Sequence, residues 1–93
     1  MRATLNGSVV ATSDDIVSTG GYAYFPPDAV KREWLEKSPK TADDLRCPHG
    51  VQFYDVVIGE ARHARNAWSY EAPQPKMEQV RDRFGFWKDV AVA

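Results

Sequence analysis

Two tight-turn signals in the first quarter of the chain do most to limit how it can fold. Asn6-Gly7 stands among β-prone residues at positions 4–11 and supplies the two positive-φ positions of a type I′ hairpin turn. Gly20-Gly21 divides a second β-prone segment, residues 16–25, in the same way. Pro26-Pro27 ends this segment because proline has no N–H to donate to a sheet. The pattern predicts an antiparallel meander of four short strands.

Helical patterns are short and few. Over Asp28–Lys37, Val30 and Trp34 are spaced i,i+4 and share one helical face, and the acid in the first turn suits the helix dipole. We therefore predict an α-helix over this segment and a polar loop over Lys40–Leu45. A second short helix is predicted over Lys76–Arg83.

The second half of the chain carries the longest β-prone run, Phe53–Ile58. After a turn, a basic segment, Arg62–Arg65, leads to Trp68 and Tyr70, which are two residues apart and so share one face of a strand. Residues 84–92 supply the last strands. Together these patterns predict one domain over residues 1–93 that is mainly β, at the margin of α+β. We expect about six to eight short antiparallel strands and one or two short helices.

Charge and cysteine content exclude several classes of protein. Twelve basic residues balance thirteen acidic ones, so the chain lacks the basic surface that phosphate neutralisation on DNA requires. One cysteine cannot form an internal disulfide, and no apolar run approaches the length of a membrane span. We expect a cytoplasmic protein with no DNA or membrane partner and no cofactor. Unpaired meander edges make a homodimer possible.

Five stretches of the chain, in this order, match a family pattern: Tyr24–Val30, Cys47-Pro48, Tyr54–Val56, Asn66–Tyr70 with Pro73 after it, and Phe86-Trp87. Together they resemble the domain-of-unknown-function 427 family. The resemblance covers nearly the whole chain and implies a small, mostly bacterial, β-rich domain without an established activity. It also implies a β-tent-like shape, in which small antiparallel sheets meet at an angle over an aromatic-lined pocket.

Two features of the sequence limit the functions that can be inferred from this resemblance. The family is sometimes labelled nucleotidyltransferase-like, but the spaced carboxylates and nucleotide-binding loop of that chemistry are not present in this sequence. The family usually continues Cys-Pro with an aromatic residue, a lysine and a glycine. Here His49-Gly50 follows Cys47-Pro48 without the lysine. Any family function that depends on that lysine is in doubt for this chain.

The candidate site combines aromatic rings with a thiol and an imidazole: Tyr24, Cys47, His49, Tyr54, Trp68 and Tyr70. We expect the rings to stack on a small molecule while Cys47, His49 and Asp55 supply polar contacts. An alternative is an enzyme of group transfer or hydrolysis that uses Cys47 and His49 as nucleophile and base. A second alternative is a protein-interaction module without a pocket ligand.

Each candidate residue also has a purely structural reading. The aromatic residues can simply form the core, and a lone cysteine can serve as a small apolar residue. Arg62–Arg65 can be a solvated hairpin tip, and Asp55 can lie on the solvent face of its strand or orient an arginine or histidine. One cysteine and two histidines fall short of the usual zinc ligand set, so no metal site is predicted.

Overall fold

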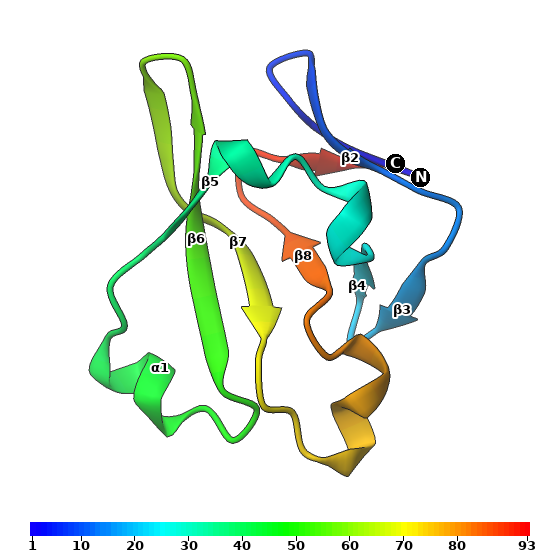
Figure 1. The fold of residues 1–93 in the computed structure, drawn as a ribbon, viewed down its shortest axis with the longest axis vertical. Coiled ribbons are helices and arrows are strands. Elements are labelled where there is room, and N and C mark those ends of the chain that lie inside the picture. Colours follow the sequence, from blue (N-terminus) through cyan, green and yellow to red (C-terminus); the bar gives the residue numbers. More distant parts are fainter.

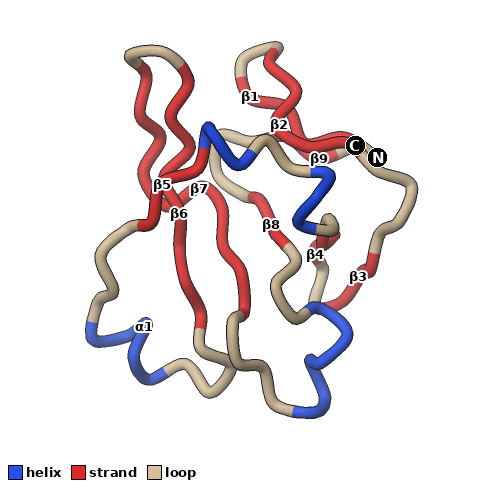
Figure 2. The backbone as a smooth tube through the Cα atoms, viewed as in Figure 1, coloured by secondary structure: helices blue, strands red, loops and turns tan.

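The computed structural model describes residues 1–93 and contains three small antiparallel sheets (Figure 1, Figure 2), which confirms the mainly β prediction. The strands are β1 (Arg2–Leu5), β2 (Ser8–Thr12), β3 (Val17–Thr19), β4 (Tyr22–Tyr24), β5 (Leu35–Lys37), β6 (Val51–Ile58), β7 (Ala61–Tyr70), β8 (Phe84–Phe86) and β9 (Ala91–Val92). The helical elements are the 3-10 turns η1 (Pro27–Ala29), η2 (Arg32–Trp34) and η3 (Pro75–Val80), and the helix α1 (Ala42–Arg46).

Two of the three sheets lie side by side, and the third contains both the first and the last strand of the chain. Their strand orders are β2-β1-β9, β3-β4 and β5-β6-β7-β8. The last strand, β9, pairs with β1, which brings the two ends of the chain together (Figure 1). Just after β4, Phe25 exchanges two backbone hydrogen bonds of 2.9 Å with Phe84 of β8, which fixes the β3-β4 hairpin beside the four-stranded sheet.

The two predicted hairpins form, but the meander does not. Asn6 and Gly7 both have positive φ in the turn between β1 and β2, and Gly20 and Gly21 do the same between β3 and β4. However, β2 and β3 lie in different sheets. The free side of β2 is occupied instead by the segment around Val30, which bridges to Ala11. The meander prediction was wrong because a distant segment takes this edge.

The predicted α-helix over Asp28–Lys37 is also wrong. The segment forms η1 and η2 and then the edge strand β5, which pairs with β6 through Leu35–Val56 and Lys37–Tyr54. Pairing with a long central strand outweighs the weak helical preference of the segment. In this extended arrangement Glu36 pairs with Arg62, and Lys37 lies 4.0 Å from Glu71.

The α-helix lies in the stretch that was predicted to be a polar loop. The Thr41 hydroxyl accepts a hydrogen bond from the Asp44 N–H at 3.2 Å, and the Asp44 carboxylate accepts one from the Thr41 N–H at 3.0 Å. This reciprocal pair is a capping box, with Asp44 in the place of the usual glutamate. The expected helix over Lys76–Arg83 is the 3-10 turn η3 over Pro75–Val80.

The four-stranded sheet has a buried layer on each face. On one face Tyr54, Val56, Ala67 and Phe84 join the larger core with residues of β1 and β2. The opposite face carries a smaller cluster of four buried residues, Tyr24, Val51, Trp68 and Val80. Strand alternation produces this division, since residues one apart on β6 or β7 point to opposite faces.

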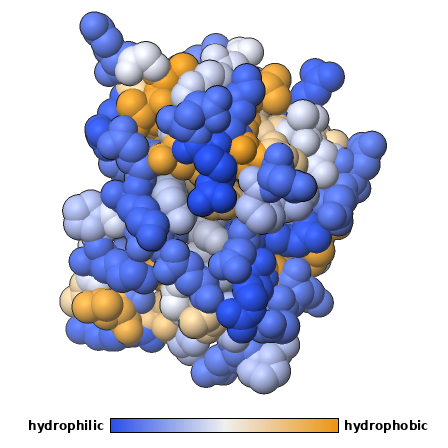
Figure 3. All heavy atoms as spheres, in the orientation of Figure 1, coloured by the Kyte–Doolittle hydropathy of each residue, from blue (hydrophilic) through white to orange (hydrophobic).

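The outer surface is mostly hydrophilic in the view of Figure 3, with hydrophobic residues in the upper part and at the lower left, where α1 lies. In α1, Leu45 is 73% exposed. No helix is long and apolar enough to cross a membrane.

Candidate functional site

The smaller buried cluster is the aromatic centre of the molecule. Trp68 of β7 is 4% exposed and lies edge-on to three other rings. Its ring centroid is 4.9 Å from that of Tyr22, 5.9 Å from Tyr24 and 5.5 Å from Trp87. Phe53, opposite Trp68 on β6, stacks on Trp87 at 5.8 Å. These residues come from β4, β6, β7 and the end of β8, so the cluster forms only in the folded chain. We call it the aromatic cluster.

A glycine allows Trp68 to lie flat against the sheet. Gly85 is the cross-strand partner of Trp68 in the β7-β8 pair. A Cβ atom at Gly85 would approach the Trp68 ring to 2.6 Å, which is well inside van der Waals contact. The indole therefore occupies the space that a side chain at position 85 would need. This packing explains why β8 has glycine between two buried phenylalanines.

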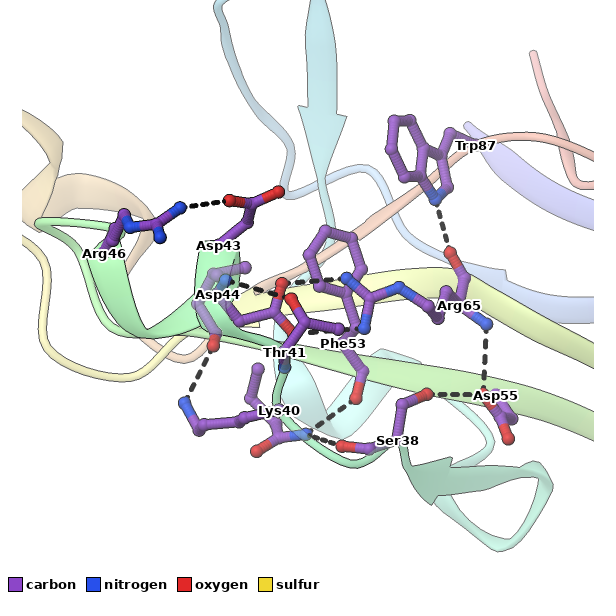
Figure 4. A network of polar contacts seen from close by, with 12 residues as sticks. Ser38, Lys40, Thr41, Asp43, Asp44, Arg46, Phe53, Asp55, Arg65 and Trp87 are labelled. Atoms are coloured by element: carbon purple, nitrogen blue, oxygen red, sulfur yellow. Dashed lines mark hydrogen bonds and ion pairs between the residues drawn. The ribbon is translucent and has the colours of Figure 1, made fainter.

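A polar network fixes the outer side of the aromatic cluster (Figure 4). The Arg65 guanidinium lies 4.0 Å from the centre of the Phe53 ring and donates two hydrogen bonds to Asp44, at 3.0 and 2.8 Å. These bonds hold the pKa of Asp44 at about 2, below its ordinary value of 3.8. The Trp87 indole N–H donates to the Arg65 carbonyl oxygen. The network thus joins α1, β7 and two rings of the cluster.

A β-bulge places Arg65 in this position. The pairing of β6 with β7 shifts between Tyr54 and Val56, and Arg65 adopts a left-handed backbone with φ of 59°. The Asp55 carboxylate accepts a 3.0 Å hydrogen bond from the Arg65 N–H and further bonds from Ser38 and Arg62. Burial raises the pKa of Asp55, but these bonds outweigh it and hold the pKa below its usual range. Asp55 therefore orients arginines, which is one of the roles expected for it.

A small hollow opens at the surface of the aromatic cluster. It has a volume of about 130 Å³ and six lining residues, all apolar or aromatic: Tyr22, Val51, Phe53, Trp68, Tyr70 and Trp87. Beneath it, the Trp68 indole N–H is buried and makes no hydrogen bond. Trp68 lowers the pKa of the Tyr24 hydroxyl. Burial nevertheless raises the pKa of Tyr24 to about 12.

The family described as a domain of unknown function (DUF427) matches residues 1–93. The chain belongs to the DUF427 family. A comparison with curated proteins finds no significant match. The family assignment confirms the resemblance seen in the sequence, and it assigns no activity to the aromatic cluster or to any other part of this DUF427 domain.

The other predicted site residues of the DUF427 domain divide into two groups. Tyr24, Trp68 and Tyr70 belong to the aromatic cluster, and the partly buried Cys47 packs against it. The His49 ring lies edge-on to Tyr70 at 5.4 Å, at the margin of the cluster. Tyr54 lies on the opposite face of the sheet, 5.2 Å from Phe84 in the larger core. The structure therefore brings five of the six predicted residues to one side and separates Tyr54 from them.

The Cys47–His49 pair lacks the geometry of a nucleophile and its base. The His49 Nδ1 atom accepts a 3.0 Å hydrogen bond from the backbone N–H of Gln74, and no hydrogen bond joins the imidazole to the thiol. Cys47 follows α1 as its C-terminal cap and begins the turn that leads to β6. The imidazole holds the η3 connection in place, and the thiol fills space beside the aromatic cluster.

The candidate site lacked five residues that shape the cluster: Tyr22, Phe53, Arg65, Gly85 and Trp87. Tyr22 and Phe53 were placed in strands, but their faces were not assigned. Arg65 was expected in a solvated hairpin tip, whereas it lies within β7 and its side chain is 28% exposed. The period-2 spacing of Phe53 and Val51, opposite Trp68 and Tyr70, is the signal that identifies this face.

Proposed function

We propose that this DUF427 domain binds a small planar molecule, or the planar part of a larger one, in the hollow of the aromatic cluster. One observation carries the proposal: a hollow of about 130 Å³ is lined only by apolar and aromatic side chains. An apolar cavity of roughly 150 Å³ is large enough to bind benzene. A single ring therefore matches the available space, whereas complete drug-sized ligands need roughly 300 Å³ or more.

The charges near the hollow favour a neutral or anionic ring over a cation. The Arg65 guanidinium already covers one face of Phe53, and the Lys88 ammonium lies 5.2 Å from the centre of the Trp87 ring. Both cations occupy ring faces, of Phe53 and Trp87, that could otherwise attract a cationic ligand, and their positive charge would repel it. A carboxylate on a bound ring would instead find Lys88 close to the margin of the hollow.

The test is a titration with single-ring probes, followed through the tryptophan side chains. Benzoate, nicotinamide and uracil represent anionic and neutral planar rings. We expect at least one of them to shift the indole N–H signals of Trp68 and Trp87 in ¹⁵N-correlated NMR spectra, with Kd on the order of 0.1–1 mM. The indole signal of Trp34, which lies outside the hollow, serves as the internal reference.

Two variants separate binding in the hollow from general surface contact. Tyr22→Ala removes one wall of the hollow, and because Tyr22 is 40% exposed the domain should remain folded. We expect this change to abolish the shifts. The matched control, Leu45→Ala, removes a 73% exposed apolar side chain on α1 and should leave them unchanged. If no probe moves the Trp68 and Trp87 signals, the proposal is wrong and the interaction-module alternative gains support.

A further inference from the structure

A second hollow lies on the opposite face of the four-stranded sheet, and it is larger and polar. Its volume is about 340 Å³, within the range of small-molecule sites. The floor is formed by Tyr54, Ser69 and Phe84, from β6, β7 and β8. Charged side chains from η2, from β5 and from the segments that flank η3 form the walls. We call this feature the polar hollow.

Two hydroxyl groups in the floor of the polar hollow lack partners within the protein. Tyr54 is 6% exposed and Ser69 is 3% exposed, so both residues are more than nine-tenths buried. Neither hydroxyl forms a hydrogen bond with another group of the chain, yet both residues line the hollow. The Trp68 indole N–H is the one fully buried side-chain polar atom without a partner, so the oxygens of Tyr54 and Ser69 stay open to the hollow. These two hydroxyls are therefore available to a bound molecule.

Two oppositely charged side chains in the walls, Arg32 and Asp82, also make no ion pair. Arg32 forms no ion pair, and its guanidinium lies 4.9 Å from the centre of the Phe84 ring. Asp82 makes no salt bridge; its left-handed backbone, with φ of 60°, is anchored by a 3.0 Å hydrogen bond from its N–H to Tyr70. The other two charged residues of the hollow, Lys37 and Glu71, lie 4.0 Å from each other. One cation and one anion thus remain without partners in the same hollow.

Electrostatics around Tyr54 agree with this arrangement. Burial raises the pKa of the Tyr54 hydroxyl, Glu71 and Asp82 raise it further, and Arg32 opposes them. The hydroxyl therefore remains protonated at neutral pH and can donate a hydrogen bond. The charges that affect its pKa are those that a ligand in the polar hollow would meet.

We propose that the polar hollow binds a small zwitterion of the amino-acid class. The carboxylate of the ligand would accept hydrogen bonds from the Arg32 guanidinium and from the Tyr54 and Ser69 hydroxyls, which are donors suited to an anionic oxygen. The ammonium group would form an ion pair with the Asp82 carboxylate. This site is separate from the aromatic cluster, because the two hollows lie on opposite faces of β6 and β7.

The binding test uses three sets of matched probes in ¹⁵N NMR titrations at millimolar concentration: free amino acids, their N-acetyl derivatives and the corresponding amines. We expect at least one free amino acid to shift the amide signals of Ser69, Asp82 and Phe84. The derivatives lack either the ammonium or the carboxylate group, so their affinity should be lower by about tenfold or more. The indole N–H signals of the aromatic cluster should not move.

Four variants test the assigned roles. Arg32→Gln and Asp82→Asn should each weaken binding by about tenfold or more, and asparagine tolerates the left-handed backbone at position 82. The control Arg46→Gln removes an exposed arginine of α1 that pairs only with Asp43 and should leave affinity unchanged. Tyr54→Phe and Ser69→Ala should weaken binding while the melting temperature of the free protein stays the same or rises.

For Tyr54→Phe and Ser69→Ala, ligand affinity and melting temperature together distinguish a binding role of the hydroxyl from a structural one. A hydroxyl that stabilised the fold would lower the melting temperature when removed, whereas an unpartnered one would not. The proposal is overturned if no free amino acid shifts the signals of the polar hollow. It is equally overturned if the N-acetyl derivatives bind as well as the free forms, or if Arg32→Gln binds like the unaltered chain. Shifts confined to the indole signals would support the aromatic hollow alone.

Discussion

Replacing Asp44 with asparagine tests whether its ion pair with Arg65 holds α1 against the sheet. The Asp44 side chain is 4% exposed and accepts two hydrogen bonds from the guanidinium, at 3.0 and 2.8 Å. Asparagine has the same shape and keeps an oxygen that can accept the 3.0 Å bond from the Thr41 N–H. The substitution therefore removes the charge while it preserves most of the helix cap.

The pKa of Asp44 sets the size of the effect. The pKa of the Asp44 carboxyl group falls from 3.8 to about 2 on folding. One pKa unit corresponds to about 1.36 kcal/mol, so the shift indicates at most about 2–3 kcal/mol of stabilisation at neutral pH. Arg65 is 28% exposed, and water screens part of the interaction. We expect Asp44→Asn to lower the free energy of unfolding by ~1–2 kcal/mol.

The effect should depend on pH in one direction only. Because the folded-state pKa of Asp44 is lower than the unfolded-state value, the unfolded chain binds the proton first as pH falls. The stabilisation is therefore fully present above the unfolded value of 3.8 and is lost as pH falls towards about 2. The difference in stability between Asp44→Asn and the unaltered chain should shrink over the same interval.

Urea unfolding followed by tryptophan fluorescence, at neutral pH and at about pH 3, measures both predictions. The neighbouring Asp43 provides the control, since it pairs with Arg46 while the two side chains are 89% and 74% exposed. Asp43→Asn should cost at most about 0.5 kcal/mol. If the two substitutions cost the same, or if the Asp44→Asn difference is as large at acidic pH as at neutral pH, the ion pair with Arg65 does not hold α1 against the sheet.

Four further outcomes are expected from unfolding and labelling experiments. Gly85→Ala should destabilise the domain by about 1–3 kcal/mol because the new methyl group would meet the Trp68 ring at 2.6 Å; an unchanged melting temperature would contradict this packing. Trp68→Ala should cost about 3–5 kcal/mol, enough to unfold much of a small domain, and a folded, barely altered variant would place Trp68 outside the core. Thr41→Ala removes the cap of α1 and should cost about 1 kcal/mol in urea unfolding; no loss would mean that the Asp44–Arg65 pair alone holds the helix. Cys47 is partly buried, so iodoacetamide should react with it more slowly in the folded chain than in urea, and equal rates would show a fully accessible thiol.

The turn residues and the alternation of side chains made the strand content of the domain predictable. Asn6-Gly7 and Gly20-Gly21 take the positive φ values that tight hairpin turns require, and these values depend on the residues themselves. The spacing of Trp68 and Tyr70 likewise placed both in one cluster. Such features depend on neighbouring residues only, so they can be predicted from a single sequence.

Long-range pairing explains the errors at residues 28–37 and at Arg65, whereas the missed helix α1 had a local signal. Residues 28–37 show an i,i+4 pattern, but β6 is a long strand with an open edge, and hydrogen bonds to it convert Leu35–Lys37 into a strand. The capping box of Thr41 and Asp44 was a readable helix signal that was overlooked, since Thr-x-x-Asp fits the motif. Nothing in the spacing around Arg65 indicates that its guanidinium lies over Phe53, because a β-bulge sets that position.

Short antiparallel strands with tight turns are encoded locally in this DUF427 chain, and the candidate site contained three of the six aromatic residues that gather on one face, Tyr24, Trp68 and Tyr70. The position of Tyr54 depends on the folded chain: it lies on the other face, where it lines the polar hollow with Ser69, Arg32 and Asp82. Strand register is the cause. A shift of one residue moves a side chain to the opposite face of a sheet, and the bulge that sets the β6-β7 register is a property of both strands together.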